Sequence, residues 1–139
     1  MTGLTTHVLD TITGKPACGV KIELYAILPN GQSSDEKSSS HPSRKADGTN
    51  LPVKSRLLVT TTNHDGRTDR PLIDETAISA GTYEIHFFTA DYFAKQGVKL
   101  DEPPFLDEII IRFAIADSKA HYHVPLLLSP WSYSTYRGS

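Results

Sequence analysis

The sequence predicts an all-β protein built as an antiparallel β-sandwich, and three observations lead to this prediction. Seven or eight short stretches are rich in apolar and β-branched residues, often alternating with polar ones as in a strand with one buried face. Turn-forming residues separate these stretches at regular spacing. The chain of 139 residues is long enough for one core but short for two, so residues 1–139 are expected to form a single domain.

The N-terminal half is expected to hold three strands and a long loop. "LTTHVLD" (4–10) and "GVKIELYAIL" (19–28) alternate apolar with polar residues, and a turn-rich stretch joins them. The segment at about 29–54 is rich in Ser, Lys, Asp, Gly and Pro and nearly empty of apolar residues, which predicts a mobile surface loop. "SRLLVTTTN" (55–63) is the third strand. The Asp-Gly pair that follows is a hairpin signal, which puts Arg67 just past a tight turn.

The C-terminal half is expected to hold four strands and the only good helix candidate. The helix is short because it ends on Gly97, a residue typical of helix C-termini. Pro125 cannot donate a ladder hydrogen bond, so its strand is expected to lie at an edge or to contain a bulge. The expected elements are strands at 81–89, 107–115, 121–129 and 133–137, and a helix at 90–97.

Composition excludes several classes of partner. The formal charge is −2 and lysines and arginines are scattered, so no basic surface for nucleic acid or an anionic membrane is expected. No window approaches the ~18 apolar residues of a membrane span. Cys18 is the single cysteine and cannot form an internal disulfide, and the N-terminus lacks the features of a secretory signal. A small-molecule or protein partner and an intracellular location are the expectations.

Three histidines are candidates for chemistry. His121 and His123 lie two apart on one expected strand, so their side chains leave the same face roughly 6.5–7 Å apart. His7 joins them only if the fold brings the first strand alongside. With six histidines in the chain, such a pair also arises by chance and commonly just forms hydrogen bonds. Three histidines also suit a catalytic zinc ion, but the sequence near His121 and His123 offers no carboxylate to orient a ligand, and a nearby guanidinium would repel the cation.

Three motifs resemble those of the transthyretin-related 5-hydroxyisourate hydrolases. They are "HVLDTITGKPA" at the start, "NHDGR" in the middle and "HYHVPLLLSPWSYSTYRGS" at the end. The resemblance covers nearly the whole chain, and the terminal "YRGS" is its most specific element. Only the segment 29–54 departs from the family pattern, because it is longer than the usual family loop.

The resemblance implies a transthyretin-like sandwich of two four-stranded sheets with one short helix, assembled as a homotetramer that is a dimer of dimers. It implies hydrolysis of 5-hydroxyisourate, in urate degradation, to 2-oxo-4-hydroxy-4-carboxy-5-ureidoimidazoline, with no metal and no cofactor. The matching positions imply catalytic roles for His7, Arg67 and His123, and leave open which imidazole is the base. They imply substrate binding by the C-terminal residues Tyr136, Arg137, Gly138 and Ser139.

An alternative within the same resemblance is a transthyretin-like carrier that binds a small molecule in the central channel without catalysis. Against it, transthyretin lacks this pair of histidines and has a small residue where Tyr136 stands, so a bulky phenol is expected to shorten the channel. A zinc hydrolase is a third hypothesis.

The C-terminal residues are expected to form a wall of the pocket, with the terminal carboxylate near an arginine. A cytoplasmic location is expected, with the peroxisome as the alternative, although the C-terminus is not Ser-Lys-Leu.

Overall fold

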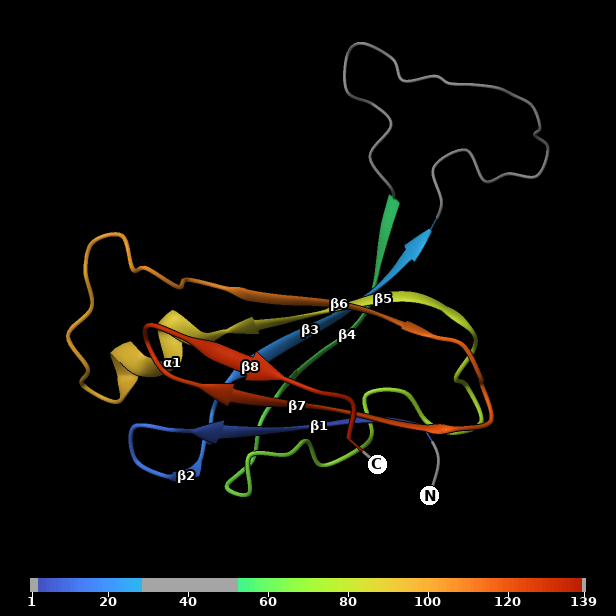
Figure 1. The fold of residues 1–139 in the computed structure, drawn as a ribbon, viewed down its shortest axis with the longest axis horizontal. Coiled ribbons are helices and arrows are strands. Elements are labelled where there is room, and N and C mark those ends of the chain that lie inside the picture. Colours follow the sequence, from blue (N-terminus) through green and yellow to red (C-terminus); the bar gives the residue numbers. More distant parts are fainter. Residues whose placement is uncertain (1–2, 29–52, 139) are drawn as a thin grey trace, which may run out of the picture.

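The computed structural model describes residues 3–28 and 53–138, which form two four-stranded sheets and one helix (Figure 1). The first sheet has the strand order β2-β1-β7-β8 and the second has the order β4-β3-β5-β6. The strands are β1 (Gly3–Asp10), β2 (Lys15–Pro16), β3 (Lys21–Leu28), β4 (Val53–Thr61), β5 (Gly81–Phe88), β6 (Ile109–Ile115), β7 (His121–Leu128) and β8 (Tyr133–Thr135), and the helix is α1 (Thr89–Lys95).

The sandwich predicted from the strand pattern is confirmed, with one refinement. All pairs of strands are antiparallel except β1 and β7, which run parallel over their whole length. These two strands are joined by more than a hundred residues rather than by a hairpin, so no tight turn forces them to run in opposite directions.

One apolar core fills the space between the sheets. In β1, Leu4 and Val8 are fully buried, while Thr5 and His7 lie on the other face and are half-buried. This alternation follows from the two-residue period of a strand. Helix α1 lies at one end of the sandwich (Figure 1) and buries Tyr92 and Phe93. The Tyr92 hydroxyl donates to the buried carboxylate of Asp10 over 2.8 Å, which ties the helix to the end of β1.

Several expected boundaries need correction. Residues 53 and 54 belong to β4 rather than to the loop expected at 29–54, while residues 29–52 lie outside the described part of the chain. The short strand β2 was not expected, because its two residues lie in a turn-rich stretch. The last strand ends at Thr135 rather than at residue 137.

The tight turn predicted at Asp65-Gly66 is confirmed, because the Gly66 amide donates to the Asn63 oxygen over 2.9 Å, but the turn does not close a hairpin. The chain turns there but does not return along β4. It runs instead along the part of β1 that β2 leaves unpaired, where Gly66 accepts a hydrogen bond from the Val8 amide over 2.8 Å and Ile73 accepts one from the Leu4 amide over 3.0 Å. Gly66 has a φ of 75°, and a Cβ there would lie 2.4 Å from the Val8 oxygen, so this position requires glycine.

The prediction that Pro125 marks an edge or a bulge is also wrong. Strand β7 lies between β1 and β8, and its register with β1 is unbroken. The ladder to β8 is interrupted instead, with pairing at Leu126↔Thr135 and again at His123↔Gly138. The missing N–H of Pro125 falls in this gap, which explains how a central strand accommodates a proline.

Candidate active site

The parallel register of β1 and β7 brings the histidines of both strands to one face. Thr5 is the direct partner of His123, and His7 is the direct partner of Pro125. Because odd-numbered residues of both strands point away from the core, the side chains of Thr5, His7, His121 and His123 all leave the outer face of the first sheet. The fold therefore brings His7 to the same face as His121 and His123.

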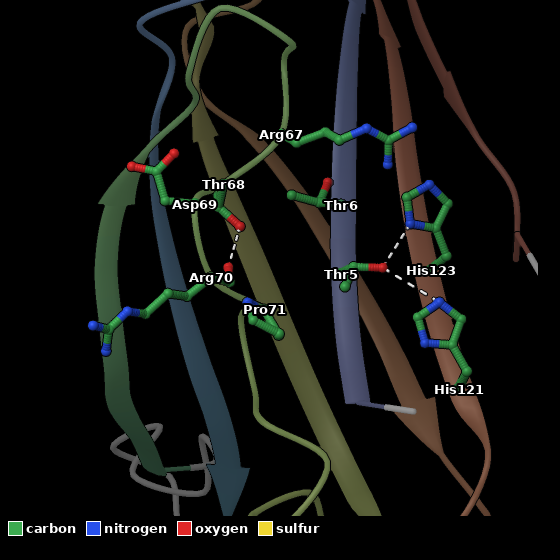
Figure 2. A pocket seen from close by; sticks show the side chains of 9 residues that line it. All are labelled: Thr5, Thr6, Arg67, Thr68, Asp69, Arg70, Pro71, His121 and His123. Atoms are coloured by element: carbon green, nitrogen blue, oxygen red, sulfur yellow. Dashed lines mark hydrogen bonds between the residues drawn. The ribbon is translucent and has the colours of Figure 1, made fainter. Parts of the chain in front are cut away.

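Asn63 organises the turn that carries Arg67. Its side-chain oxygen accepts hydrogen bonds from the Asp65 amide over 2.9 Å and the Arg67 amide over 3.3 Å, and its amide nitrogen donates to Asp69 over 2.9 Å. Together with the contact of Gly66 to β1, this network presents the Arg67 side chain across β1 toward β7 (Figure 2).

A cleft of about 400 Å³ opens between this turn and the histidines. Figure 2 shows residues 67–71 as one wall and His121 and His123 as the other, with Thr5 between the two histidines. The full lining consists of Thr5, Thr6, Arg67, Thr68, Asp69, Arg70, Pro71, His121 and His123. His7 does not line the cleft, although it is close enough to His123 to influence its charge.

His123 is held in one orientation by its neighbours. Its Nδ1 lies 2.8 Å from the Thr5 hydroxyl, and its backbone oxygen accepts a hydrogen bond from the Gly138 amide over 2.7 Å. Gly138 lies against the imidazole so closely that a Cβ there would be 2.7 Å from His123 Cδ2. Burial holds the pKa of His123 below its ordinary value, and the charges of Arg67, His121 and His7 lower it further. These effects all favour the neutral form of the ring.

The C-terminal residues expected to bind substrate divide between two places. Gly138 lies against His123, whereas Tyr136 is 61% exposed and lines a hollow beside β6. The Arg137 guanidinium stacks 4.3 Å from the ring centroid of Tyr122, a core residue whose side chain leaves β7 on the face opposite to the histidines. Arg137 also lines a separate hollow beside His121 and Gly138. Ser139 lies outside the described residues.

The remaining histidines lie elsewhere. His86 is on the opposite face of β5 from the buried Tyr83, and its ring nitrogens lie 2.9 Å from Glu84 and 3.4 Å from Glu108. His64 is exposed in the turn before Arg67. His41 lies outside the described residues.

Sequence reasoning missed Thr5 as a member of this site. The alternation of β1 does place Thr5 on the same face as His7, but only the register with β7 shows that its hydroxyl lies between two imidazoles. Local sequence cannot reveal that register, since β1 and β7 are far apart in the chain.

Two further findings concern metals and membranes. Within residues 3–28 and 53–138, no three His, Cys, Asp or Glu side chains lie close enough together to hold a metal ion. In the same part of the chain, no helix is long and apolar enough to cross a membrane.

The sandwich of two four-stranded sheets, with imidazoles and a guanidinium on the outer face of one sheet, defines a transthyretin-like protein with a polar cleft. The HIUase/Transthyretin family matches residues 4–138, and the chain belongs to this family. The family membership expected from the three sequence motifs is thereby confirmed.

Relatives with known names agree with this membership. The 5-hydroxyisourate hydrolase of Deinococcus radiodurans is 47% identical over 99% of this chain and 96% of its own length. The 5-hydroxyisourate hydrolase of Ralstonia nicotianae is 45% identical over 98% of this chain and 97% of its own length.

Solved structures show the same fold. The 5-hydroxyisourate hydrolase of Klebsiella pneumoniae has a TM-score of 0.67 and 29% identity, with all of both chains covered. Sea bream transthyretin in complex with thyroxine has a TM-score of 0.71 and 26% identity over 97% of this chain and 93% of its own. An (S)-allantoin synthase has a TM-score of 0.79 and 38% identity over 99% of this chain, which spans 44% of that longer protein.

Proposed function

We propose that this protein hydrolyses 5-hydroxyisourate to 2-oxo-4-hydroxy-4-carboxy-5-ureidoimidazoline in the degradation of urate. The observation that carries the proposal is the cleft in which His123, with its depressed pKa, faces Arg67. Relatives that match this chain almost end to end at 45–47% identity are 5-hydroxyisourate hydrolases. Site and relatives therefore support the same reaction.

The reaction opens a ring by adding water across a cyclic amide and breaking its C–N bond. It needs a group that removes a proton from water near neutral pH and a cation that stabilises the oxyanion formed at the attacked carbonyl. His123 meets the first need because burial and nearby positive charge keep its imidazole neutral. The Arg67 guanidinium, which Figure 2 shows beside the His123 ring, meets the second with a planar fork of donors. His7, near His123 on the same face, is assigned to positioning the water.

The C-terminal residues complete the proposed binding site. Gly138 has no side chain, so the substrate can approach His123 on that side, and a larger residue would meet the imidazole. Tyr136 is assigned to closing the channel on which the cleft opens. Arg137 and Ser139 are assigned to substrate binding, which for Arg137 requires its guanidinium to leave the ring of Tyr122.

The proposed reaction uses no metal ion and no organic cofactor. Imidazoles that hold a catalytic zinc ion usually donate their second N–H to a carboxylate or carbonyl, whereas Nδ1 of His123 contacts the Thr5 hydroxyl. The guanidinium of Arg67 beside it is also unfavourable for a second cation.

The proposed assembly is a homotetramer, a dimer of dimers. Strands β6 and β8 are edge strands in the described sheets, and an unpaired strand edge is a ready template for pairing with another chain. Ile110, Tyr133 and Tyr136 expose apolar surface on or next to these strands, being 43%, 44% and 61% exposed. Sedimentation velocity at micromolar concentration tests the assembly, and a monomer would contradict it.

The decisive experiment generates 5-hydroxyisourate in situ from urate and follows its decay by absorbance with and without the protein. The proposal expects a large acceleration that survives exhaustive chelation. Turnover that is lost on chelation and restored by zinc would support the zinc hydrolase instead.

A second candidate function is a non-catalytic carrier, which the structural likeness to thyroxine-bound sea bream transthyretin favours. It would use the same face of the first sheet to bind an aromatic ligand in the channel. Thyroxine binding measured by calorimetry, together with no acceleration of 5-hydroxyisourate decay, would support the carrier and overturn the enzyme.

A further inference from the structure

Thr5 connects two imidazoles through a single hydroxyl group. Its Oγ1 lies 2.8 Å from Nδ1 of His123 and 3.5 Å from Nε2 of His121 (Figure 2). The two rings are nearly parallel, with centroids 6.4 Å apart and an angle of 14° between their planes. Since the Thr5 side chain is half-buried between them, its hydroxyl is well placed to exchange a proton with either ring.

A hydroxyl carries one proton, so it can donate to only one of the two rings and must accept from the other. Figure 2 shows the second nitrogen of His123, Nε2, turned toward the Arg67 guanidinium. A lone pair at that position is attracted to the cation, whereas an N–H would be repelled. This favours the tautomer of His123 with its proton on Nδ1, donated to Thr5, and it leaves the Thr5 hydroxyl free to donate to His121.

We propose that Thr5 is a positioning residue that couples His123 to His121, so that the proton taken from water during ring opening is passed on to His121. The inference rests on the proposed hydrolysis. His123 accepts the water proton at Nε2 while hydroxide adds to the carbonyl carbon. The Nδ1 proton passes to Thr5, and the Thr5 hydroxyl proton passes to Nε2 of His121. When the C–N bond breaks, the proton returns by the same route to the leaving nitrogen, so the groups end as they began.

The relay removes positive charge from an unfavourable position. An imidazolium at His123 is opposed by burial and by Arg67, the same causes that lower the pKa of His123. His121 is the first residue of β7, and Figure 2 shows it farther than His123 from the Arg67 guanidinium. The charged or titratable groups around the pair are Arg67, Asp69 and Arg70, which line the same cleft, His7 in β1, and Arg137, which lines the hollow beside His121.

The second nitrogen of His121 supports this assignment. Its Nδ1 is buried and has no hydrogen-bond partner in the described part of the chain. In the described residues, the Thr5 hydroxyl at Nε2 is therefore the side-chain hydrogen-bond contact of this ring. That contact is long at 3.5 Å, but catalytic hydrogen bonds commonly shorten when substrate binds.

Steady-state kinetics of variants provide the first test. Thr5→Val keeps the shape of the side chain and removes the hydroxyl, so we expect kcat to fall roughly tenfold with KM unchanged, less than the loss from removing the base itself. Thr5→Ser should restore most of kcat. His121→Gln should resemble Thr5→Val, and the double variant should be no worse than either single one, because both remove the same route.

Matched controls lie outside the site. Thr82→Val removes a hydroxyl from a half-buried strand threonine of the second sheet, and His64→Gln removes an exposed imidazole. Both should retain native kcat. Circular dichroism and thermal unfolding of every variant show whether it is folded, so that a lower kcat in a folded variant can be attributed to loss of the relay. Native kcat in folded Thr5→Val, or strictly multiplicative losses in the double variant, would overturn the proposal.

Nitrogen-15 NMR of the histidine rings without substrate provides a test that does not depend on activity. We expect the proton of neutral His123 on Nδ1 in the native protein and in Thr5→Ser, and a mixture of tautomers in Thr5→Val. His121→Gln should also change the titration of His123. A native His123 with its proton on Nε2 would overturn the relay, whereas failure to hydrolyse 5-hydroxyisourate with the expected tautomer would overturn only the proposed function.

Discussion

The outer faces of the two sheets both carry histidines and arginines, but in opposite electrostatic settings. On the second sheet, Nε2 of His86 lies 2.9 Å from Glu84 and Nδ1 lies 3.4 Å from Glu108, while the ring of Tyr25 packs 4.6 Å away. On the first sheet, His123 contacts the Thr5 hydroxyl and Gly138, and the positive charge of Arg67 acts on its ring.

The carboxylates of the second sheet explain why the electrostatic settings of the two faces differ. Glu84 also binds Arg112 over 2.8 Å and Lys54 over 3.0 Å. Burial alone would raise the pKa of Glu84, but the hydrogen bonds from His86, Lys54 and Arg112 outweigh burial and lower it to about 2. Cations on the second sheet are thus paired with anions of the same chain, while the cleft on the first sheet has positive charge to offer to a ligand. The same residue types therefore stabilise the fold on one face and are available for chemistry on the other.

The largest expected effect contrasts histidines on the two faces. His7→Ala and His123→Ala should each lower turnover by roughly 10²-fold or more, the usual scale for a general acid or base. His86→Ala should leave turnover near native and lower stability, because it leaves Glu84 and Glu108 without that partner. Steady-state 5-hydroxyisourate decay and thermal unfolding of the three variants measure both quantities. An inactive but stably folded His86→Ala protein would contradict the prediction that His86 contributes to stability rather than to turnover.

The next effect concerns stability. Glu84→Gln should lower the free energy of unfolding by about 1–3 kcal/mol at pH 7, because His86, Lys54 and Arg112 lose a buried charged acceptor. The pKa of Glu84 is lowered from 4.5 to about 2 on folding, so its ionisation stabilises the protein above pH 4.5 and this contribution is lost as the pH falls toward 2. Urea unfolding from pH 7 to pH 2.5 should show the native and Glu84→Gln curves converging below pH 4.5. A difference that is independent of pH would contradict the prediction.

Replacing an arginine by lysine should lower turnover at the cleft of the first sheet but not on the second sheet. Arg67→Lys keeps the charge but loses the planar fork that can hold two oxygens, so turnover should fall by roughly tenfold. Arg112→Lys, which retains a cation beside Glu84, should leave turnover unchanged. Equal turnover in both variants would remove Arg67 from the proposed site.

The smallest expected effect is a shift in pH dependence. Because positive charge at Arg67 lowers the pKa of His123, Arg67→Gln should raise that pKa and move the acid limb of kcat/KM to higher pH. Burial is the larger cause and persists in the variant, so the shift should be less than about one pH unit. The residual activity of Arg67→Gln, followed from pH 5 to pH 8, measures it. A shift to lower pH would show that another group controls the limb.

The sequence by itself determined most of the strands and the single core, and it singled out Arg67 and His123, which both line the cleft. Alternation in β1 and β7 separates Leu4 and Val8 from His7, and Tyr122 from His121 and His123, because a strand has a period of two residues. The three motifs identified the family before any geometry was known. These properties are local, so they can be read from short stretches of sequence.

Only the tertiary structure decided which residues of different strands meet. The parallel pairing of β1 with β7 places Thr5 between His121 and His123, and the path of the chain after Gly66 along β1 brings Arg67 opposite them. The hairpin expected at Asp65-Gly66 and the edge expected at Pro125 failed for the same reason. A turn signal fixes the local backbone and a proline removes one donor, but which strand lies alongside is set by burial of the whole core and by register over more than a hundred residues.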